Sequence, residues 1–401
     1  MRLGGALLLG IGVTMASLAF GSRPLGVVGV GLVLAASAAR IWAGLVRGGV
    51  SVSHGAVPTP AVEGERVRMR IEVRRLSRVP VGSAVSHGCL GRLGPFSCRL
   101  RGHGRRLSGQ LDLGRLPRGR FPLSDARLVL GDHLGLESVS RPVDHGGLAV
   151  VVHPRLVEVD LLFSDAGRFG ADGRRLLLRR PSGFDLHSVR EYAQGESLRR
   201  VHWPSTARTG QLMVKELEDS PRETVTVLLD CDPATVAGAP PHWSFDAAVR
   251  AAGSIVRYYA SEGRKATLLT TARDGVVQPV TTVDGDVPTA LGMLAAVEPD
   301  ALFGLAPWLR QEQSRDNHGG ELVVVTANLE PAALDAILAS ATRRLVAVVW
   351  VDAASYVGRP TRSATGPLRL SASGIPVAVV RRGEDLKSAL DFSAPEAQAH
   401  G

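Results

Sequence analysis

The chain has 401 residues, 45% hydrophobic and 21% charged, which favours two or three packed domains over a disordered chain. Only 4% of the residues are aromatic, which argues against a surface for stacking single-stranded nucleic acid, and the three cysteines exclude a disulfide framework. The net charge of +9 originates early in the chain, because residues 47–155 carry 18 basic and 8 acidic side chains. Only three of the 47 basic residues are lysines, an imbalance more typical of a GC-rich genome than of a nucleic-acid ligand, so we expect no nucleic-acid partner.

Two apolar runs open the chain. Residues 3–20 form 18 residues without a charge, about 27 Å as a helix and close to the thickness of a bilayer core. A break at Gly21–Pro24 precedes a second run, residues 25–46, whose one charge is Arg40 near its end. We therefore predict a transmembrane helical hairpin over residues 1–46. A ridge of small residues is expected to pack its two helices together: Gly31, Ala35, Ala39 and Ala43.

The charges around these runs predict an orientation. Arg2, Arg40 and Arg47 flank the two outer ends, whereas the connecting loop holds Arg23. The positive-inside rule then places both ends and the soluble part in the cytoplasm of a two-pass protein of the cell membrane, with the lipid bilayer as a partner. The alternative is a signal peptide cleaved near Ser17–Ala19.

Residues 47–155 alternate between apolar and polar positions in short runs cut by glycine and proline. This period of two predicts an antiparallel, Ig-like β-sandwich with one solvated face. The runs lie at residues 67–73, 110–113, 126–130 and 148–152.

Residues 222–392 change to strands alternating with helices, which predicts a doubly wound, mostly parallel α/β sheet. The last residues, 393–401, are expected to form a disordered tail. Strands are predicted at residues 224–229, 266–271, 322–326, 345–351 and 377–380, and helices at 245–261, 288–297 and 331–341.

The segment between these domains, residues 156–221, concentrates cationic and aromatic side chains. Its stretch from Gly183 to Glu218 can be a linker whose arginines pair with nearby glutamates and whose tryptophan fills a core. It can also be an anchor surface that binds a partner or clamps the two domains, since arginine and tryptophan dominate such contacts. The candidate residues are Arg190, Glu191, Tyr192, Gly195, Arg199, Arg200, Trp203, Arg208 and Lys215, and we expect Trp203 to be buried between the two domains.

This segment resembles the signature of the domain-of-unknown-function 58 family. The family pattern is a Leu-Arg-Glu-Tyr block, a glycine-acid turn, an arginine-rich stretch ending in tryptophan, Ala-Arg, and a Leu-x-Val-Lys-Glu strand. The chain departs from it conservatively, with Val189 for leucine and Glu196 for aspartate. The matching blocks, in order, are Val189–Tyr192, Gly195–Glu196, Arg199–Trp203, Ala207–Arg208 and Leu212–Glu216.

The resemblance implies that the α/β part is similar to a von Willebrand factor A domain, and that the partner is a MoxR-type AAA+ ATPase. Such domains often hold Mg²⁺ in an Asp-x-Ser-x-Ser loop, with a distant threonine and aspartate. Here the loop runs from Asp230 through Asp232 to Ala234, and a later strand ends at Thr326–Asn328 where intact sites carry Thr-Asp-Gly. Thr289 is a candidate for the distant threonine. We interpret Asp230 and Asp232 as a degenerate remnant and expect no metal and no cofactor.

The sequence is therefore interpreted as a membrane-anchored, non-enzymatic scaffold for envelope or complex assembly. The alternative is a membrane-surface hydrolase or other enzyme, since Ser188 and Ser205 lie close in sequence to Asp185, His187 and His202. No Gly-x-Ser-x-Gly elbow, Walker A loop or dinucleotide fingerprint accompanies them.

Overall fold

The computed structural model describes residues 2–46, 50–57, 59–75, 79–102, 104–144, 146–165, 188–191, 203–216, 224–313, 320–360 and 365–391. The chain divides into two compact units, Met1–His153 and Pro154–Gly401, and each has its own hydrophobic core. The expected disordered tail, residues 393–401, lies outside the described residues.

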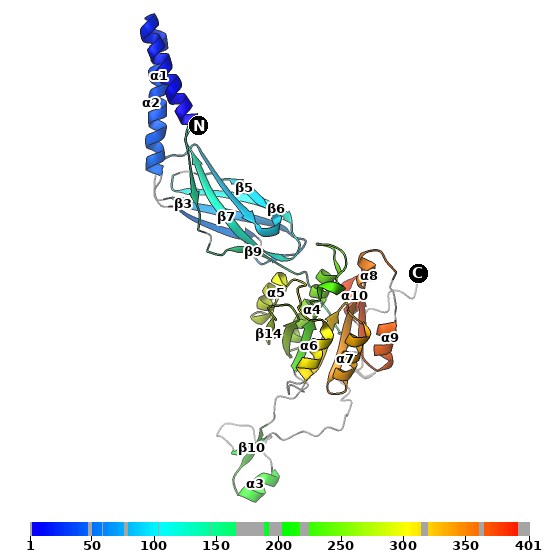
Figure 1. The fold of residues 1–401 in the computed structure, drawn as a ribbon. Coiled ribbons are helices and arrows are strands. Elements are labelled where there is room, and N and C mark those ends of the chain that lie inside the picture. The colour runs from blue at the N-terminus through cyan, green and yellow to red at the C-terminus, as the bar shows by residue number, and fades with distance from the viewer. Residues whose placement is uncertain are drawn as a thin grey trace. The chain divides into compact units, whose positions relative to one another are not determined.

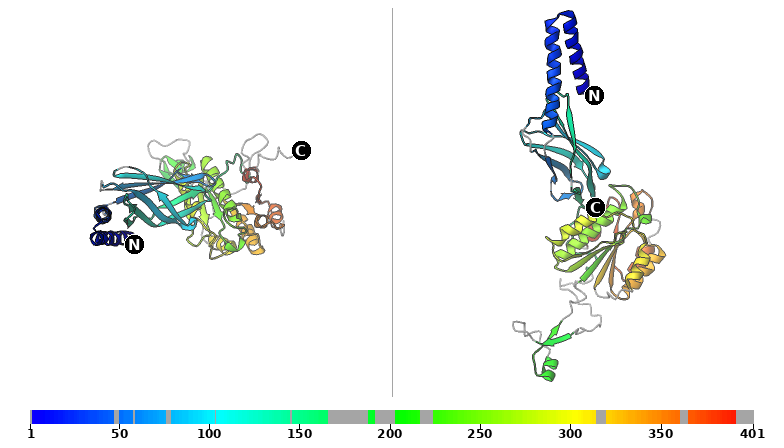
Figure 2. Two further views of the ribbon diagram at one scale, coloured as in Figure 1. Left: turned by 90° about the horizontal axis from the view of Figure 1, so that it is seen from above. Right: turned by 60° about the vertical axis from the view of Figure 1, so that its left-hand side comes forward.

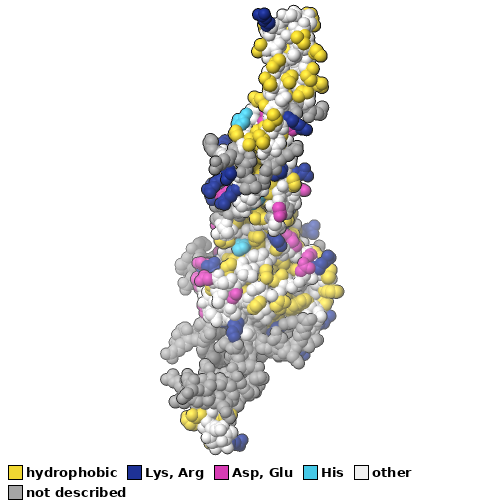
Figure 3. Space-filling view, turned by 90° about the vertical axis from the view of Figure 1, so that its left-hand side faces the viewer, with side chains coloured by type: hydrophobic (Ala, Val, Ile, Leu, Met, Phe, Trp, Pro, Cys, Tyr) yellow, Lys and Arg dark blue, Asp and Glu magenta, His cyan; other side chains and the backbone are white. Residues whose placement is uncertain are grey.

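The first unit begins with two helices that lie side by side, α1 (Arg2–Phe20) and α2 (Arg23–Val46) (Figure 1). Within the described residues, α2 is the helix long and apolar enough to cross a membrane, with a mean hydropathy of 1.8, while the apolar part of α1, Gly4–Phe20, is shorter. Large hydrophobic side chains cover the outside of this hairpin in Figure 3, with Phe20 80% and Val27 75% exposed. Such a continuous apolar surface is typical of contact with lipid.

The seam between α1 and α2 differs from the predicted ridge. Gly29 lies where a Cβ would come within 2.4 Å of the Thr14 hydroxyl, so this glycine lets the helices approach closely. Ala39 and Ala43 are buried as expected, but Gly31 is exposed and has nothing within 4 Å of its Cβ position. A four-residue repeat drifts around a helix of 3.6 residues per turn, so the predicted ridge could not keep facing one partner.

The rest of the first unit is a pair of β-sheets around one core, which supports the predicted β-rich domain. Val67, Met69 and Ile71 on one sheet and Leu128 and Leu130 on the other meet inside it. One sheet has the order β1 (Val50–Val57), β3 (Arg66–Arg75), β6 (Arg106–Arg115). The other has the order β2 (Ala61–Val62), β9 (Ala149–His153), β7 (Gly119–Gly131), β4 (Ser83–Leu90), β5 (Pro95–Arg99), with β8 (Ser138–Pro142) also paired to β7.

Helix α2 joins this β domain directly. Val46, the last residue of α2, is 1% exposed and belongs to the core of the β domain. The Trp42 indole donates a hydrogen bond of 2.8 Å to the Pro80 carbonyl. These contacts fix the end of the apolar hairpin to the β domain.

The second unit is built on a mostly parallel six-stranded sheet, as expected from the alternation of strands and helices. Its order is β14 (Val277–Val280), β13 (Lys265–Thr270), β12 (Thr224–Leu229), β15 (Glu321–Thr326), β16 (Leu345–Val351), β17 (Val377–Val380), with β14 antiparallel. Besides α3 (Trp203–Thr209), the helices of this unit are α4 (Ser244–Ser261), α5 (Asp286–Ala296), α6 (Leu305–Gln313), α7 (Pro331–Ala341), α8 (Ala353–Tyr356), α9 (Thr365–Ala372) and α10 (Leu386–Leu390).

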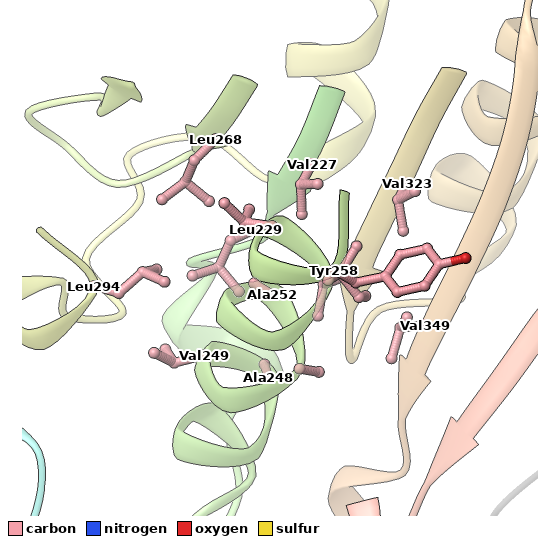
Figure 4. Packing of buried hydrophobic residues seen from close by; sticks show 14 of the residues in the cluster. Val227, Leu229, Ala248, Val249, Ala252, Tyr258, Leu268, Leu294, Val323 and Val349 are labelled. Atoms are coloured by element: carbon pink, nitrogen blue, oxygen red, sulfur yellow. The ribbon is translucent and has the colours of Figure 1, made fainter. Parts of the chain in front are cut away.

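Helices cover both faces of this sheet (Figure 2). Val227 and Leu229 of β12 point toward α4, which contributes Ala248, Val249 and Ala252 to the same cluster (Figure 4). The opposite face packs on α6, α7 and α9 through side chains such as Leu305, Ile337 and Leu370. Both faces of β12 and β15 therefore contribute apolar side chains to a core, which explains their β-branched and apolar sequence.

The segment that enters the second unit, residues 154–165, packs on α4 and α10. The Asp391 carboxylate, at the end of α10, accepts hydrogen bonds from the backbone N–H of Asp160 at 3.0 Å and of Leu161 at 3.3 Å. The Ser254 hydroxyl of α4 accepts another from the Val157 N–H at 3.0 Å. Residues 154–165 are thus fixed to the α/β domain by bonds to residues far away in the sequence.

Candidate functional site

Part of the signature segment forms a small hairpin with a helix. Strand β10 (Ser188–Glu191) pairs antiparallel with β11 (Met213–Glu216), so that Arg190 lies opposite Val214 and Val189 opposite Lys215. Helix α3 (Trp203–Thr209) ends at Gly210, whose φ of +72° is the left-handed conformation common at helix ends. The Met213 N–H donates to the Thr206 hydroxyl at 3.0 Å, which ties α3 to β11.

The expected burial of Trp203 is wrong in this structure. Trp203 is the first residue of α3 and is 66% exposed, and Leu212 beside the hairpin is 41% exposed. A seven-residue helix packed on a four-residue strand offers too little apolar surface to cover an indole. Arg208 is also exposed. Helix α3 and the turn that follows it therefore present two large apolar side chains and a guanidinium to their surroundings.

The other signature residues divide by position. The backbones of Arg190, Glu191 and Lys215 lie in β10 and β11. Tyr192, Gly195, Arg199 and Arg200 lie outside the described residues. The structure does not test the hydrolase alternative, because Asp185, His187 and His202 also lie outside the described residues. Leu212 was not among the candidate residues, although it begins the Leu212–Glu216 block that matches the family pattern.

A second candidate site lies where β12 and β15 end. Strand β12 pairs with β13 on one side and β15 on the other, so the chain leaves β12 in one direction and later returns on its opposite side. In open α/β sheets, ligands bind at such a switch point beyond the carboxyl ends of the strands. Asp230 directly follows β12 and Thr326 is the last residue of β15. The two residues meet at this point.

The Asp230 carboxylate is 6% exposed and lies among hydrogen-bond donors. Its Oδ2 accepts from the Thr326 hydroxyl at 2.7 Å, and its Oδ1 from the Asp232 N–H at 3.2 Å and the Thr271 hydroxyl at 3.4 Å. Burial raises the pKa of Asp230 above its ordinary value, and the bond from Thr326 is the largest opposing effect. Thr271, which directly follows β13, was not predicted as a site residue. A local sequence pattern does not show which strand ends lie side by side, so it could not place Thr271 next to Asp230.

These residues do not fit a Mg²⁺ site. Both oxygens of Asp230 already accept hydrogen bonds, and the Thr271 and Thr326 hydroxyls also accept from the N–H groups of Cys231 and Asn328 at 2.8 Å. The Asp232 carboxylate accepts from the Ala234 N–H, and Ala234 itself has no side-chain oxygen. Thr289 lies in α5, where its hydroxyl donates to the carbonyl of Gly285, the residue just before that helix. Within the described residues, no group of three or more His, Cys, Asp or Glu side chains is placed to hold a metal ion.

Cys231, the residue between the two aspartates, is fully buried. Burial, with the charge of Asp230, raises the pKa of its thiol to about 12. A thiol in that state is protonated at neutral pH and is a poor nucleophile. The site thus presents a buried, internally bonded carboxylate beside an inert thiol.

Comparison with known proteins finds a family match to part of the chain. Residues 188–356 match the family described as "Protein of unknown function DUF58". The match begins at β10 and covers both candidate sites.

Two further comparisons cover larger parts of the chain. "Uncharacterized protein YeaD" of Bacillus subtilis (strain 168) is 24% identical over 277 residues, which cover 66% of this chain and 67% of that protein. "Cwp6 from Clostridium difficile" is a solved structure with 10% identity and a TM-score of 0.21, and the similarity covers 84% of this chain and 38% of that one. A TM-score this low carries no argument about fold or function.

Proposed function

We propose that this chain is a membrane-anchored, non-enzymatic interaction protein that works with a MoxR-type AAA+ ATPase in the assembly of envelope or other complexes. The observation that carries the proposal is the exposure of Trp203 on α3, within the segment that resembles the family signature. Exposed tryptophan and arginine side chains on one short helix, Trp203 and Arg208, are of the residue types that dominate binding energy between proteins. The type of ATPase comes from the family resemblance.

The membrane part of the proposal is a two-pass hairpin with both units in the cytoplasm. The outward apolar side chains of α1 and α2 support it, as do Arg2 and Arg40 at the outer ends. A reporter active only in the cytoplasm, fused after Gly401, should be active. Activity of an exterior reporter at the same position would contradict this orientation.

We also propose a fold family for each of the two domains, which is more specific than the arrangement of strands and helices described above. We propose an Ig-like sandwich for the β domain, because its two sheets enclose one core. We propose a von Willebrand factor A-like fold for the α/β domain, because Asp230 follows the strand at the switch point of a mostly parallel sheet. Both carboxylate oxygens of Asp230 accept hydrogen bonds within the chain, which supports a domain that binds its partner without a metal ion.

Affinity capture from detergent-solubilised membranes tests the function. The wild-type chain should co-purify with an AAA+ ATPase, identified by mass spectrometry. Trp203→Ala should reduce the yield about thirtyfold, the effect of a typical hot-spot residue. Because Trp203 is exposed, its replacement should change the free energy of unfolding by less than about 0.5 kcal/mol.

A matched variant controls for loss of any exposed aromatic side chain. Phe303 is 71% exposed in the α/β domain and outside the signature segment, so Phe303→Ala should capture the ATPase as well as wild type does. Arg208→Ala should weaken capture while leaving the fold intact. Equal capture by wild type, Trp203→Ala and Arg208→Ala would contradict the proposed docking surface.

A further inference from the structure

The β domain contains an open groove that the proposed function does not use. It has a volume of about 660 Å³, within the range of small-molecule sites, roughly 300–1,000 Å³. The lining is polar and mostly basic. It consists of Arg70, Glu72, Ser97, Cys98, Arg99, Arg101, Ser108, Gly109, Gln110 and Leu111.

The groove follows the seam at which the two sheets of the β domain approach each other. Strand β6 runs between the two sides: Ser108 lies opposite Glu72 of β3, and its backbone exchanges two hydrogen bonds of 2.8 Å with Arg101. Gly109 permits this approach, because a Cβ there would lie within 2.9 Å of Cys98 and of the Arg99 carbonyl. Arg70 therefore belongs to one sheet, and Arg99 and Arg101 to the chain on the other side.

The three arginines of the groove are exposed. Within the described part of the chain, no carboxylate lies within 4.0 Å of the guanidinium of Arg70, Arg99 or Arg101. Arg66, on the same face of β3, does pair with Asp112 at 3.1 Å. Glu72 is the one acidic residue in the lining, so the groove carries a formal charge of about +2.

We propose that this groove binds the phosphoryl group of a small anionic ligand. Guanidinium forks match phosphate oxygens, and arginines on opposite sides of the groove suit a tetrahedral group better than a planar carboxylate. Ser97, Ser108 and Gln110 add donors for further oxygens. The groove is larger than a phosphate ion, so the phosphoryl group belongs to a larger molecule, either a phospholipid headgroup or a soluble phosphorylated compound.

The test is calorimetric titration of the full chain in phosphatidylcholine nanodiscs with inorganic pyrophosphate. Wild type should bind, and Arg70→Gln and Arg99→Gln should each weaken binding about tenfold, as expected for loss of one charged hydrogen-bonding partner. Glu72→Gln should strengthen binding, because it removes the one repulsive charge. Arg127→Gln is the matched control: Arg127 is an exposed arginine of β7 outside the groove, and its loss should leave the affinity unchanged.

Competition against bound pyrophosphate then separates the two sources of the phosphoryl group. Soluble dihexanoyl-phosphatidylglycerol should compete better than glycerol 3-phosphate if the ligand is a lipid headgroup, and worse if it is a soluble compound. Absence of pyrophosphate binding to wild type would overturn the proposal, as would equal affinities of Arg70→Gln and Arg127→Gln. Binding of a polyglutamate peptide without binding of pyrophosphate would also overturn it, in favour of an acidic peptide.

Discussion

The hydroxyl of Thr326 should be among the most costly single groups to remove from the α/β domain. Thr326→Val keeps the shape of a side chain that is 0% exposed but deletes the donor 2.7 Å from the Asp230 carboxylate. A hydrogen bond to a charged group contributes about 1.5–3 kcal/mol. The Asn328 N–H also loses its acceptor, which adds about 1 kcal/mol. We expect a loss of about 2.5–4 kcal/mol in the free energy of unfolding.

The loss of unfolding free energy caused by Thr326→Val should increase with pH. Burial raises the folded-state pKa of Asp230, so the folded chain holds this proton more firmly than the unfolded chain. Stability from this group is therefore present below the unfolded pKa, near 3.9, and is lost as the pH rises through the folded pKa. Since the Thr326 bond favours the charged carboxylate, Thr326→Val should cost more at pH 8 than at pH 5.

The assay is urea-induced unfolding, read by pulsed hydrogen exchange of β12, so that it reports on the α/β domain alone. In an Asp230→Asn background, Thr326→Val should cost only about 2 kcal/mol, about 1 for a neutral hydrogen bond and about 1 for the acceptor that the Asn328 N–H loses, and should lose its pH dependence. A cost below about 0.5 kcal/mol at pH 8 would refute this reasoning. Equal costs in the two backgrounds would refute it as well.

Three further predictions use the same domain. Asp391→Ala should lower the free energy of unfolding by about 2–4 kcal/mol, because the Asp160 and Leu161 N–H groups lose their shared acceptor, and Asp391→Asn should cost less; a full-sized loss in the asparagine variant would count against the bonding described. Melting curves in EDTA and in millimolar Mg²⁺ should coincide, since Asp230 and Asp232 already accept internal hydrogen bonds; a Mg²⁺-dependent rise that Asp230→Ala abolishes would contradict this. The Cys231 thiol, with a pKa of about 12 and full burial, should react with maleimide at pH 7.5 only after unfolding, as mass spectrometry of labelled peptides will show; rapid labelling of the folded chain would be the contrary result.

Most elements of the α/β domain could be predicted from local patterns. The strands predicted at residues 224–229 and 345–351 and the helix at 331–341 have those same bounds in β12, β16 and α7. These elements have long apolar runs or a proline at the helix start, so their signals are strong. Strand β14 was missed, because four residues that include Pro279 form too short and too irregular a pattern.

Contacts between distant residues could not be predicted in this way. Asp391 binds the backbone of Asp160 across 231 positions, and Thr326 binds Asp230 across 96, so neither pair leaves a local signature. The exposure of Trp203 depends on how much surface α3 finds to pack against, which residue type alone does not determine. The basic groove is visible in sequence only as an excess of arginine, since its geometry depends on the approach of β5 and β6.

The most direct test of the docking surface is site-specific photo-crosslinking in intact membranes. A benzoylphenylalanine placed at position 203 should form a covalent adduct with the AAA+ ATPase, because this position is exposed on α3. The same probe at position 303, exposed in the α/β domain, should not. An ATPase adduct from position 203 alone is the result that we predict. An adduct from position 303 but none from position 203 would contradict the central claim.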